Sequence, residues 1–162
     1  MLDKNEVLYH IQKALNLSIE DMIEAYKLES FDITKSQLEA LLTKRQDKSF
    51  KICSFEELGV FLDGLVILKR GPSPQKPTDK NASDEVVALT NNLILKKLRI
   101  ALELKEAETE IIFGLGDAEL TKQALKSLFR KEGHKNFKEC SDELLMAFLE
   151  GLDEFYYDGE EI

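Results

Sequence analysis

The 162-residue sequence contains no tryptophan and only three prolines. Because proline interrupts helices, its confinement to one short segment permits long helices elsewhere in the chain. No stretch approaches the roughly 18 consecutive apolar residues of a membrane-spanning helix, so we expect no membrane insertion. The N-terminus MLDKNEVLYH has neither the basic start nor the apolar stretch of a signal peptide, which predicts a cytoplasmic protein.

The sequence also lacks the short motifs that mark common catalytic and cofactor sites. It contains no G-x-S-x-G, no phosphate-binding glycine loop and no H-E-x-x-H. Its two cysteines and two histidines do not form the close ligand pairs of a zinc site. We therefore predict no catalytic residue, no metal site and no cofactor, and hence a non-enzymatic protein.

The sequence does contain an internal repeat of one unit. Residues 5–65 align with residues 92–152 without a gap, and about 22 of 61 positions are identical. The segment FKICSFEELGVFLDGL in the first copy returns as FKECSDELLMAFLEGL in the second. This degree of self-similarity indicates a tandem duplication.

The segment between the copies, GPSPQKPTDKNAS, holds all three prolines and is typical of an exposed linker. The predicted organisation has three parts. They are a first repeat at residues 1–71, a proline-rich linker at 72–83, and a second repeat with an acidic tail at 84–162.

Each copy shows the spacing of four helices. Apolar residues recur every three or four positions, which is the period of an amphipathic helix. The third and fourth helices of the first copy open with capping-box patterns, T-x-x-Q from Thr34 and S-x-x-E from Ser54. The second helix is the least regular, because the second copy has Lys105 where the first has a capping Ser18.

Two features predict how these helices pack. In the second copy, the buried stripe of the second helix is expected to shift to Ile111, Ile112 and Leu115. Gly64 and Gly151 lie mid-helix at equivalent positions, where glycine costs about 1 kcal/mol relative to alanine. A cost accepted twice predicts close backbone packing, with one copy against the other as the candidate contact. Since one unit alone has a marginal core, we expect both to pack as one all-α, pseudo-twofold body.

Cys53 and Cys140 each lie one residue before the cap of the fourth helix. Free cysteine is among the most buried residue types, so we interpret both as reduced, structural core residues. A Cys–His nucleophile is formally available from His134 and Cys140, since a helix N-terminus lowers the pKa of a thiol. The first copy has Asp47 at the histidine position, which breaks the symmetry of such a pair.

Positive charge is concentrated in the third helix and the following loop of each copy, although the net charge is −9. Residues 121–138 contain six basic residues against one acidic residue, and residues 34–51 contain five against two. The order of helices is similar to a repressor-type helix-turn-helix, whose third helix enters the major groove. The candidate nucleic-acid contacts are Lys35, Lys44, Arg45, Lys122, Lys126, Arg130 and Lys131.

Three functions stay open at this point. A duplicated helical scaffold without catalytic motifs favours a non-enzymatic binding or regulatory module that acts on a protein partner or by homo-oligomerisation. The alternative is a helix-turn-helix-like protein that binds nucleic acid with its basic third helices, unless those side chains simply solvate the helices. An enzyme built on Cys140 and His134 is the third hypothesis.

Three long segments resemble a known family: FLDGLVILKRG at residues 61–71, NNLILKKLRIALELK at 91–105 and HKNFKECSDELLMAFLEGL at 134–152. They are similar to the YehS family of small bacterial proteins, domain of unknown function 1456, over both copies from Asn5 to Leu152. The resemblance implies a duplicated bacterial cytoplasmic domain. The family brings no established activity, cofactor or catalytic residue to carry over.

Overall fold

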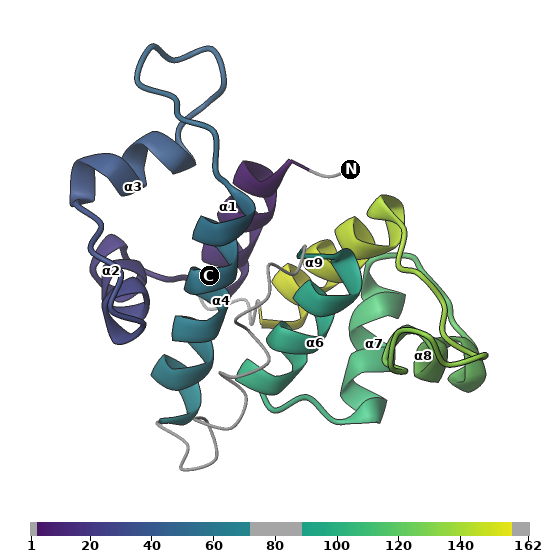
Figure 1. Cartoon of the computed structure of the whole chain (residues 1–162). Coiled ribbons are helices and arrows are strands. Elements are labelled where there is room, and N and C mark those ends of the chain that lie inside the picture. The colour runs from purple at the N-terminus through teal and green to yellow at the C-terminus, as the bar shows by residue number, and fades with distance from the viewer. Residues whose placement is uncertain (1–2, 72–88, 157–162) are drawn as a thin grey trace.

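The computed structural model describes residues 3–71 and 89–156, and the regular structure in these ranges is entirely α-helical (Figure 1). The first repeat forms α1 (Lys4–Leu15), α2 (Ile19–Leu28), α3 (Lys35–Leu42) and α4 (Phe55–Arg70). The second repeat forms α6 (Asn91–Ala101), α7 (Glu106–Leu115), α8 (Lys122–Leu128) and α9 (Asp142–Tyr156). The predicted all-α fold is confirmed, with four helices in the described part of each copy. The predicted proline-rich linker at 72–83 and the acidic end of the chain lie outside the described residues.

The first and last helices of the two repeats form the centre of the molecule (Figure 1). α1 packs against α9 and α4 packs against α6, so the first helix of each repeat contacts the last helix of the other. Ion pairs Lys97–Asp63 and Lys13–Asp153 also join the two repeats. The repeats therefore pack as one body with pseudo-twofold symmetry, as the sequence predicts.

Local sequence explains where the helices begin. The capping boxes predicted at Thr34 and Ser54 are both present. In the second of them, Ser54 Oγ accepts the backbone N–H of Glu57 at 3.0 Å, and Glu57 Oε1 accepts that of Ser54 at 2.9 Å. A lysine side chain has no acceptor, so α7 keeps only one half of the box, in which Glu108 Oε1 accepts the N–H of Lys105 at 2.8 Å.

The predicted shift of the buried stripe in the second copy is wrong: Ile112 is buried as expected, but Ile111 and Leu115 of α7 are exposed. α7 buries the same three positions as α2, now occupied by Thr109, Ile112 and Phe113. Thr109 is accepted in the core because its hydroxyl donates to the carbonyl of Lys105, one turn earlier, at 2.8 Å. The duplicated scaffold thus keeps its buried positions even where the residue type changes.

Gly64 and Gly151 mark close contacts between helix backbones. A Cβ atom on Gly64 would lie 1.8 Å from the carbonyl oxygen of Ala25 in α2, and one on Gly151 would lie 1.8 Å from that of Ile112 in α7. The predicted close packing is confirmed. Packing of one copy against the other at these glycines is wrong, because each contact lies within its own repeat.

Candidate functional site

The candidate basic residues of the first repeat are dispersed. Lys35 lies in the first turn of α3 and Lys44 follows this helix, and both are exposed. Arg45 forms an ion pair with Asp3, the N-cap of α1, and its guanidinium carbon lies 5.0 Å from the centre of the Phe50 ring. Arg45 therefore fastens its loop to α1 and is not a free positive charge.

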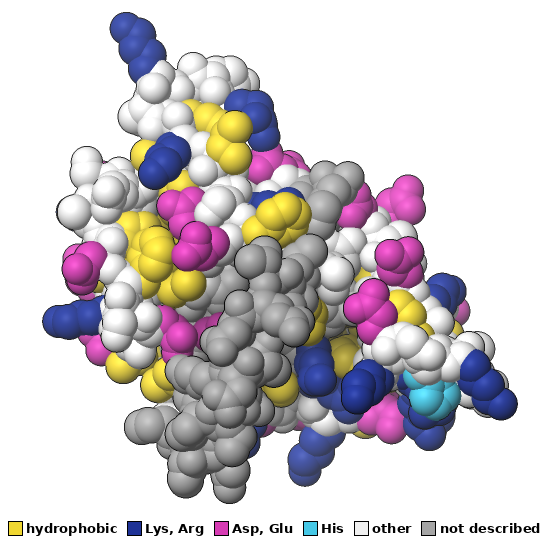
Figure 2. Space-filling view, viewed as in Figure 1, with side chains coloured by type: hydrophobic (Ala, Val, Ile, Leu, Met, Phe, Trp, Pro, Cys, Tyr) yellow, Lys and Arg dark blue, Asp and Glu magenta, His cyan; other side chains and the backbone are white. Residues whose placement is uncertain are grey.

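The candidate basic residues of the second repeat form a row. Lys122, Lys126 and Arg130 recur every four residues, so they follow one face of α8 and the turn after it. They and the following Lys131 are exposed, and no acidic side chain within residues 3–71 and 89–156 pairs with them. Figure 2 shows Lys and Arg side chains gathered over this repeat, at the lower right of the view.

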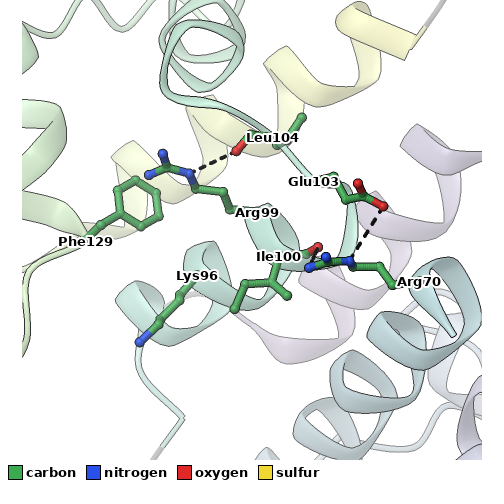
Figure 3. Close-up of a pocket in the computed structure, with 7 residues that line it drawn as sticks. All are labelled: Arg70, Lys96, Arg99, Ile100, Glu103, Leu104 and Phe129. Atoms are coloured by element: carbon green, nitrogen blue, oxygen red, sulfur yellow. Dashed lines mark hydrogen bonds and ion pairs between the residues drawn. The ribbon is translucent and has the colours of Figure 1, made fainter. Parts of the chain in front are cut away.

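A groove that the sequence does not predict lies near this row, and Figure 3 shows seven residues that line it. We call it the cationic groove; its volume is about 370 Å³, and it is lined by Arg70, Lys96, Arg99, Ile100, Glu103 and Phe129, among others. A smaller hollow of about 220 Å³ shares Arg99 and Phe129 with it and is also lined by Lys126, Arg130 and the acidic Glu106. The two hollows are therefore neighbours, and basic side chains from α4, α6 and the end of α8 line them.

Arg99 is held in place within the cationic groove. Its Nε donates to the backbone carbonyl of Leu104 at 3.2 Å. Its guanidinium carbon lies 4.6 Å from the centre of the Phe129 ring, a cation–π distance (Figure 3). The charge of Arg99 is therefore fixed between α6 and the end of α8.

Arg70 joins the groove from the first repeat. Its Nη1 donates to the carbonyl of Ile100 at 3.4 Å, and its Nε lies 3.6 Å from a carboxylate oxygen of Glu103 (Figure 3). Arg70 ends α4, whereas Lys96 and Arg99 belong to α6. The groove is thus complete only when the two repeats are packed together.

Comparison of the two repeats shows that most of these charges belong to the second repeat alone. Lys96, Arg99, Lys126 and Arg130 occupy the positions held in the first repeat by Tyr9, Gln12, Glu39 and Thr43. Since both repeats build the same scaffold, folding alone does not require these cations. A position-by-position comparison of charge between the copies is the sequence signal that singles out these four cations, although it does not show that they line a groove.

A buried asparagine in each repeat fixes the loop that carries basic residues. Asn92 Nδ2 donates to the carbonyls of Leu128 and Lys138, both at 2.9 Å, and its Oδ1 accepts the N–H of Cys140 at 2.9 Å. Asn5 makes the same three bonds at the equivalent positions of the first repeat. The sequence alignment begins at this pair of residues, but the sequence alone does not indicate their role.

Cys53 and Cys140 are buried. Burial raises the pKa of both thiols to about 12. Each Sγ lies near the backbone carbonyl of the following serine, at 3.6 Å for Ser54 and 3.5 Å for Ser141, as a weak S–H donor. Both thiols are protonated at neutral pH, so neither is prepared to act as a nucleophile.

His134 lies in the exposed loop before Cys140 and has a local structural use. Its Nδ1 accepts the backbone N–H of Asn136 at 2.9 Å. In the first repeat, Asp47 Oδ1 accepts the backbone N–H of Ser49 at 2.8 Å. The histidine and the aspartate, which differ in the sequence comparison, therefore stabilise the same turn.

We expect iodoacetamide to label Cys53 and Cys140 of the folded protein at least about a hundredfold more slowly than a free thiol at pH 8. The reason is that the thiolate is the reactive form and the pKa of each thiol is raised to about 12. Mass spectrometry of timed samples measures both rates, and the urea-unfolded protein, in which both thiols should react quickly, is the control. Rapid labelling of Cys140 alone, abolished in Cys140→Ser, would instead support the enzyme hypothesis.

Residues 3–71 and 89–156 offer neither a metal site nor a membrane span. Within these ranges, no three His, Cys, Asp or Glu side chains lie together as a metal ion would need. In the same part of the chain, no helix has both the length and the apolar character to cross a bilayer. The cationic groove and the row on α8 together form the candidate site.

The chain is thus a tandem-duplicated all-α protein with a cationic groove where the end of α4 meets the second repeat. The model of a family described as "Protein of unknown function (DUF1456)" matches it twice, at residues 4–71 and 91–156. The chain is similar to "Uncharacterized protein YehS" of Escherichia coli (strain K12), with 31% identity over 148 residues that cover 91% of this chain and 92% of the relative. It belongs to the DUF1456 family, as the resemblance of its long segments implied. No solved structure matches the chain.

Proposed function

We propose that this protein is a non-enzymatic binding module that contacts the phosphates of nucleic acid through its second repeat. The observation that carries the proposal is the exposed row Lys122, Lys126 and Arg130, which has no acidic partner in the described ranges. Contacts of Lys and Arg with phosphate supply the sequence-independent affinity for nucleic acid. In the first repeat, Glu39 interrupts the row and Arg45 is paired with Asp3.

The spacing of the helices favours contact with the backbone over base reading. Residues 116–121 connect α7 to α8, which is longer than the three- or four-residue turn of a helix-turn-helix. The likeness to that motif therefore lies in the order of the helices and not in the turn. The net charge of −9 repels a phosphate backbone elsewhere, so binding should be local and sensitive to salt.

The triple variant Lys122→Glu/Lys126→Glu/Arg130→Glu is expected to weaken nucleic-acid binding at least about tenfold at low salt. It should also flatten the plot of log affinity against log salt, by about one unit for each phosphate that the protein no longer binds. Fluorescence anisotropy of labelled mixed-sequence single strands and duplexes, across a salt series, measures both quantities. The native protein should lose affinity steeply as salt rises.

The first repeat supplies a matched control. Lys35→Glu/Lys44→Glu/Lys48→Glu changes the net charge equally at exposed positions and should leave the affinity within about twofold. The double variant Glu39→Lys/Thr43→Arg tests a gain of binding. It gives the first repeat the basic residues that the second repeat has at the equivalent positions, and it should strengthen binding.

Two results would overturn the proposal: no binding by the native protein at low salt, or equal losses in the two triple variants. Light scattering and co-purification on the same sample distinguish nucleic-acid binding from the protein-partner hypothesis. A stable homo-oligomer or a specific co-purifying protein, without nucleic-acid binding, would favour the protein-partner hypothesis.

A further inference from the structure

We infer that the cationic groove is a binding site for a phosphate monoester, either the terminal group of a phosphorylated strand or a free phosphorylated small molecule. The inference goes beyond backbone contact by α8 and does not depend on it. The groove is a hollow of about 370 Å³ lined by basic side chains from α4 and α6, which lie outside the row on α8 (Figure 3).

The groove holds more positive charge than a single backbone phosphate requires. Arg70, Lys96 and Arg99 line it together with one acidic side chain, Glu103. A phosphate monoester carries a charge of about −1.5 to −2 at pH 7, and it has three terminal oxygens. An arginine side chain can bind two of those oxygens with parallel hydrogen bonds. Figure 3 shows the three cationic groups pointing in different directions along the groove, so its surplus charge attracts a terminal phosphate and one arginine, Arg99, is the side chain to bind it.

Arg99 is prepared for such an anion. Its Nε is occupied by the carbonyl of Leu104 and its guanidinium lies over Phe129, but its terminal nitrogens have no acceptor within the described ranges (Figure 3). A guanidinium that is already fixed loses little side-chain entropy when it binds a ligand. Arg99 can thus present these two nitrogens to a phosphate without rearrangement.

Glu103 competes with the anion for Arg70. Its side chain is 65% exposed and its carboxylate lies 3.6 Å from Arg70 Nε, so an incoming phosphate can replace it. Glu103 has a positive φ of 54°, and in the first repeat Asn16 holds the equivalent position with φ 53°. Asparagine tolerates this left-handed conformation well. Glu103→Asn therefore removes the competing charge without straining the backbone.

The first repeat also supplies a substitution at Arg99 that preserves the fold. Gln12 is the equivalent residue, and its Nε2 donates to the carbonyl of Leu17 at 3.3 Å, as Arg99 Nε does to Leu104. Arg99→Gln should keep that hydrogen bond and lose only the guanidinium. An unchanged thermal unfolding curve by circular dichroism would verify that the variant is folded.

The test uses the full chain and two kinds of probe. Isothermal titration calorimetry measures binding of AMP and of inorganic phosphate, with adenosine as the control for the base and sugar. Anisotropy compares one labelled single strand carrying a 5′-phosphate with the same strand carrying a 5′-hydroxyl. We expect AMP but not adenosine to bind, or the phosphorylated strand to bind at least about fivefold more tightly. Arg99→Gln should remove that binding or preference, and Glu103→Asn should strengthen it about threefold.

The outcomes separate this inference from the proposed function. AMP binding without a preference for the phosphorylated end assigns the groove to a free small molecule, and the reverse result assigns it to a strand end. Equal affinity for both strands, with no binding of AMP or phosphate, overturns the inference and leaves backbone contact by α8 intact. Binding of AMP without binding of either strand supports the inference and overturns the proposed contact of α8 with nucleic acid. Phosphate-dependent binding that survives Arg99→Gln also overturns the inference, because the anion then lies elsewhere.

Discussion

Gly151→Ala is expected to lower the free energy of unfolding by about 3 kcal/mol, among the largest effects of a single substitution in this protein. The added Cβ would lie 1.8 Å from the carbonyl oxygen of Ile112, whereas real Cβ atoms essentially never lie closer than 3.0 Å to such an atom. Because the obstacle is backbone, α9 must move away from α7 as a whole. Gly64→Ala should do the same to α4 and α2, and urea unfolding followed by circular dichroism measures both.

Two other helical glycines are the controls for this prediction. A Cβ on Gly59 in α4 or on Gly114 in α7 would have no atom within 4 Å, so alanine should stabilise each helix by up to about 1 kcal/mol. Gly116 makes the reciprocal approach to α9, where a Cβ would lie 1.9 Å from the carbonyl oxygen of Ala147. The double variant Gly116→Ala/Gly151→Ala should therefore cost less than the sum of the singles. An effect of Gly151→Ala as small as that of Gly114→Ala would contradict the close contact.

Asn92→Ala is expected to destabilise the protein by about 3 kcal/mol, because it removes three hydrogen bonds at a buried position. The N–H of Cys140 and the carbonyls of Leu128 and Lys138 would lose their side-chain partner. Amide hydrogen exchange at Cys140, together with urea unfolding, reports whether the loop before α9 detaches first. Asn5→Ala should have a similar effect on the first repeat.

Asn136→Ala is the matched control, because this asparagine is exposed in the same loop. It should change the free energy of unfolding by no more than about 0.5 kcal/mol. If Asn92→Ala were equally mild, water would have to satisfy the three groups that Asn92 now binds. The contribution assigned to the buried asparagine would then be wrong.

The features that could be predicted from the sequence are local or repeated. The capping boxes at Thr34 and Ser54 need only residues three positions apart, and the four-helix unit appears twice in the sequence. The predicted stripe of α7 is wrong because apolar periodicity assigns a threonine such as Thr109 to the surface. The polar group of Thr109 is satisfied by its own helix, which apolar periodicity does not register.

The groove could not be predicted because its residues meet only in three dimensions. Arg70 ends α4, Arg99 lies in α6, and Phe129 follows α8. A count of charge along the chain points to residues 121–138 and passes over α6, where lysine and arginine alternate with buried apolar residues. The same holds for Gly64 and Gly151. Their equivalent mid-helix positions indicate a close contact, but which helix they contact depends on the tertiary packing.

The contact between α1 and α9 has a consequence for synthesis of the chain. It joins residues 4–15 to residues 142–156, so α1 emerges from the ribosome long before its neighbour exists. Contacts between such distant segments form late and slow the folding of a domain. Until α9 is complete, α1 presents apolar side chains to the cellular environment, and chaperones bind surfaces of this kind. The two repeats are copies in sequence, yet the nascent first repeat cannot finish folding before the second has been made.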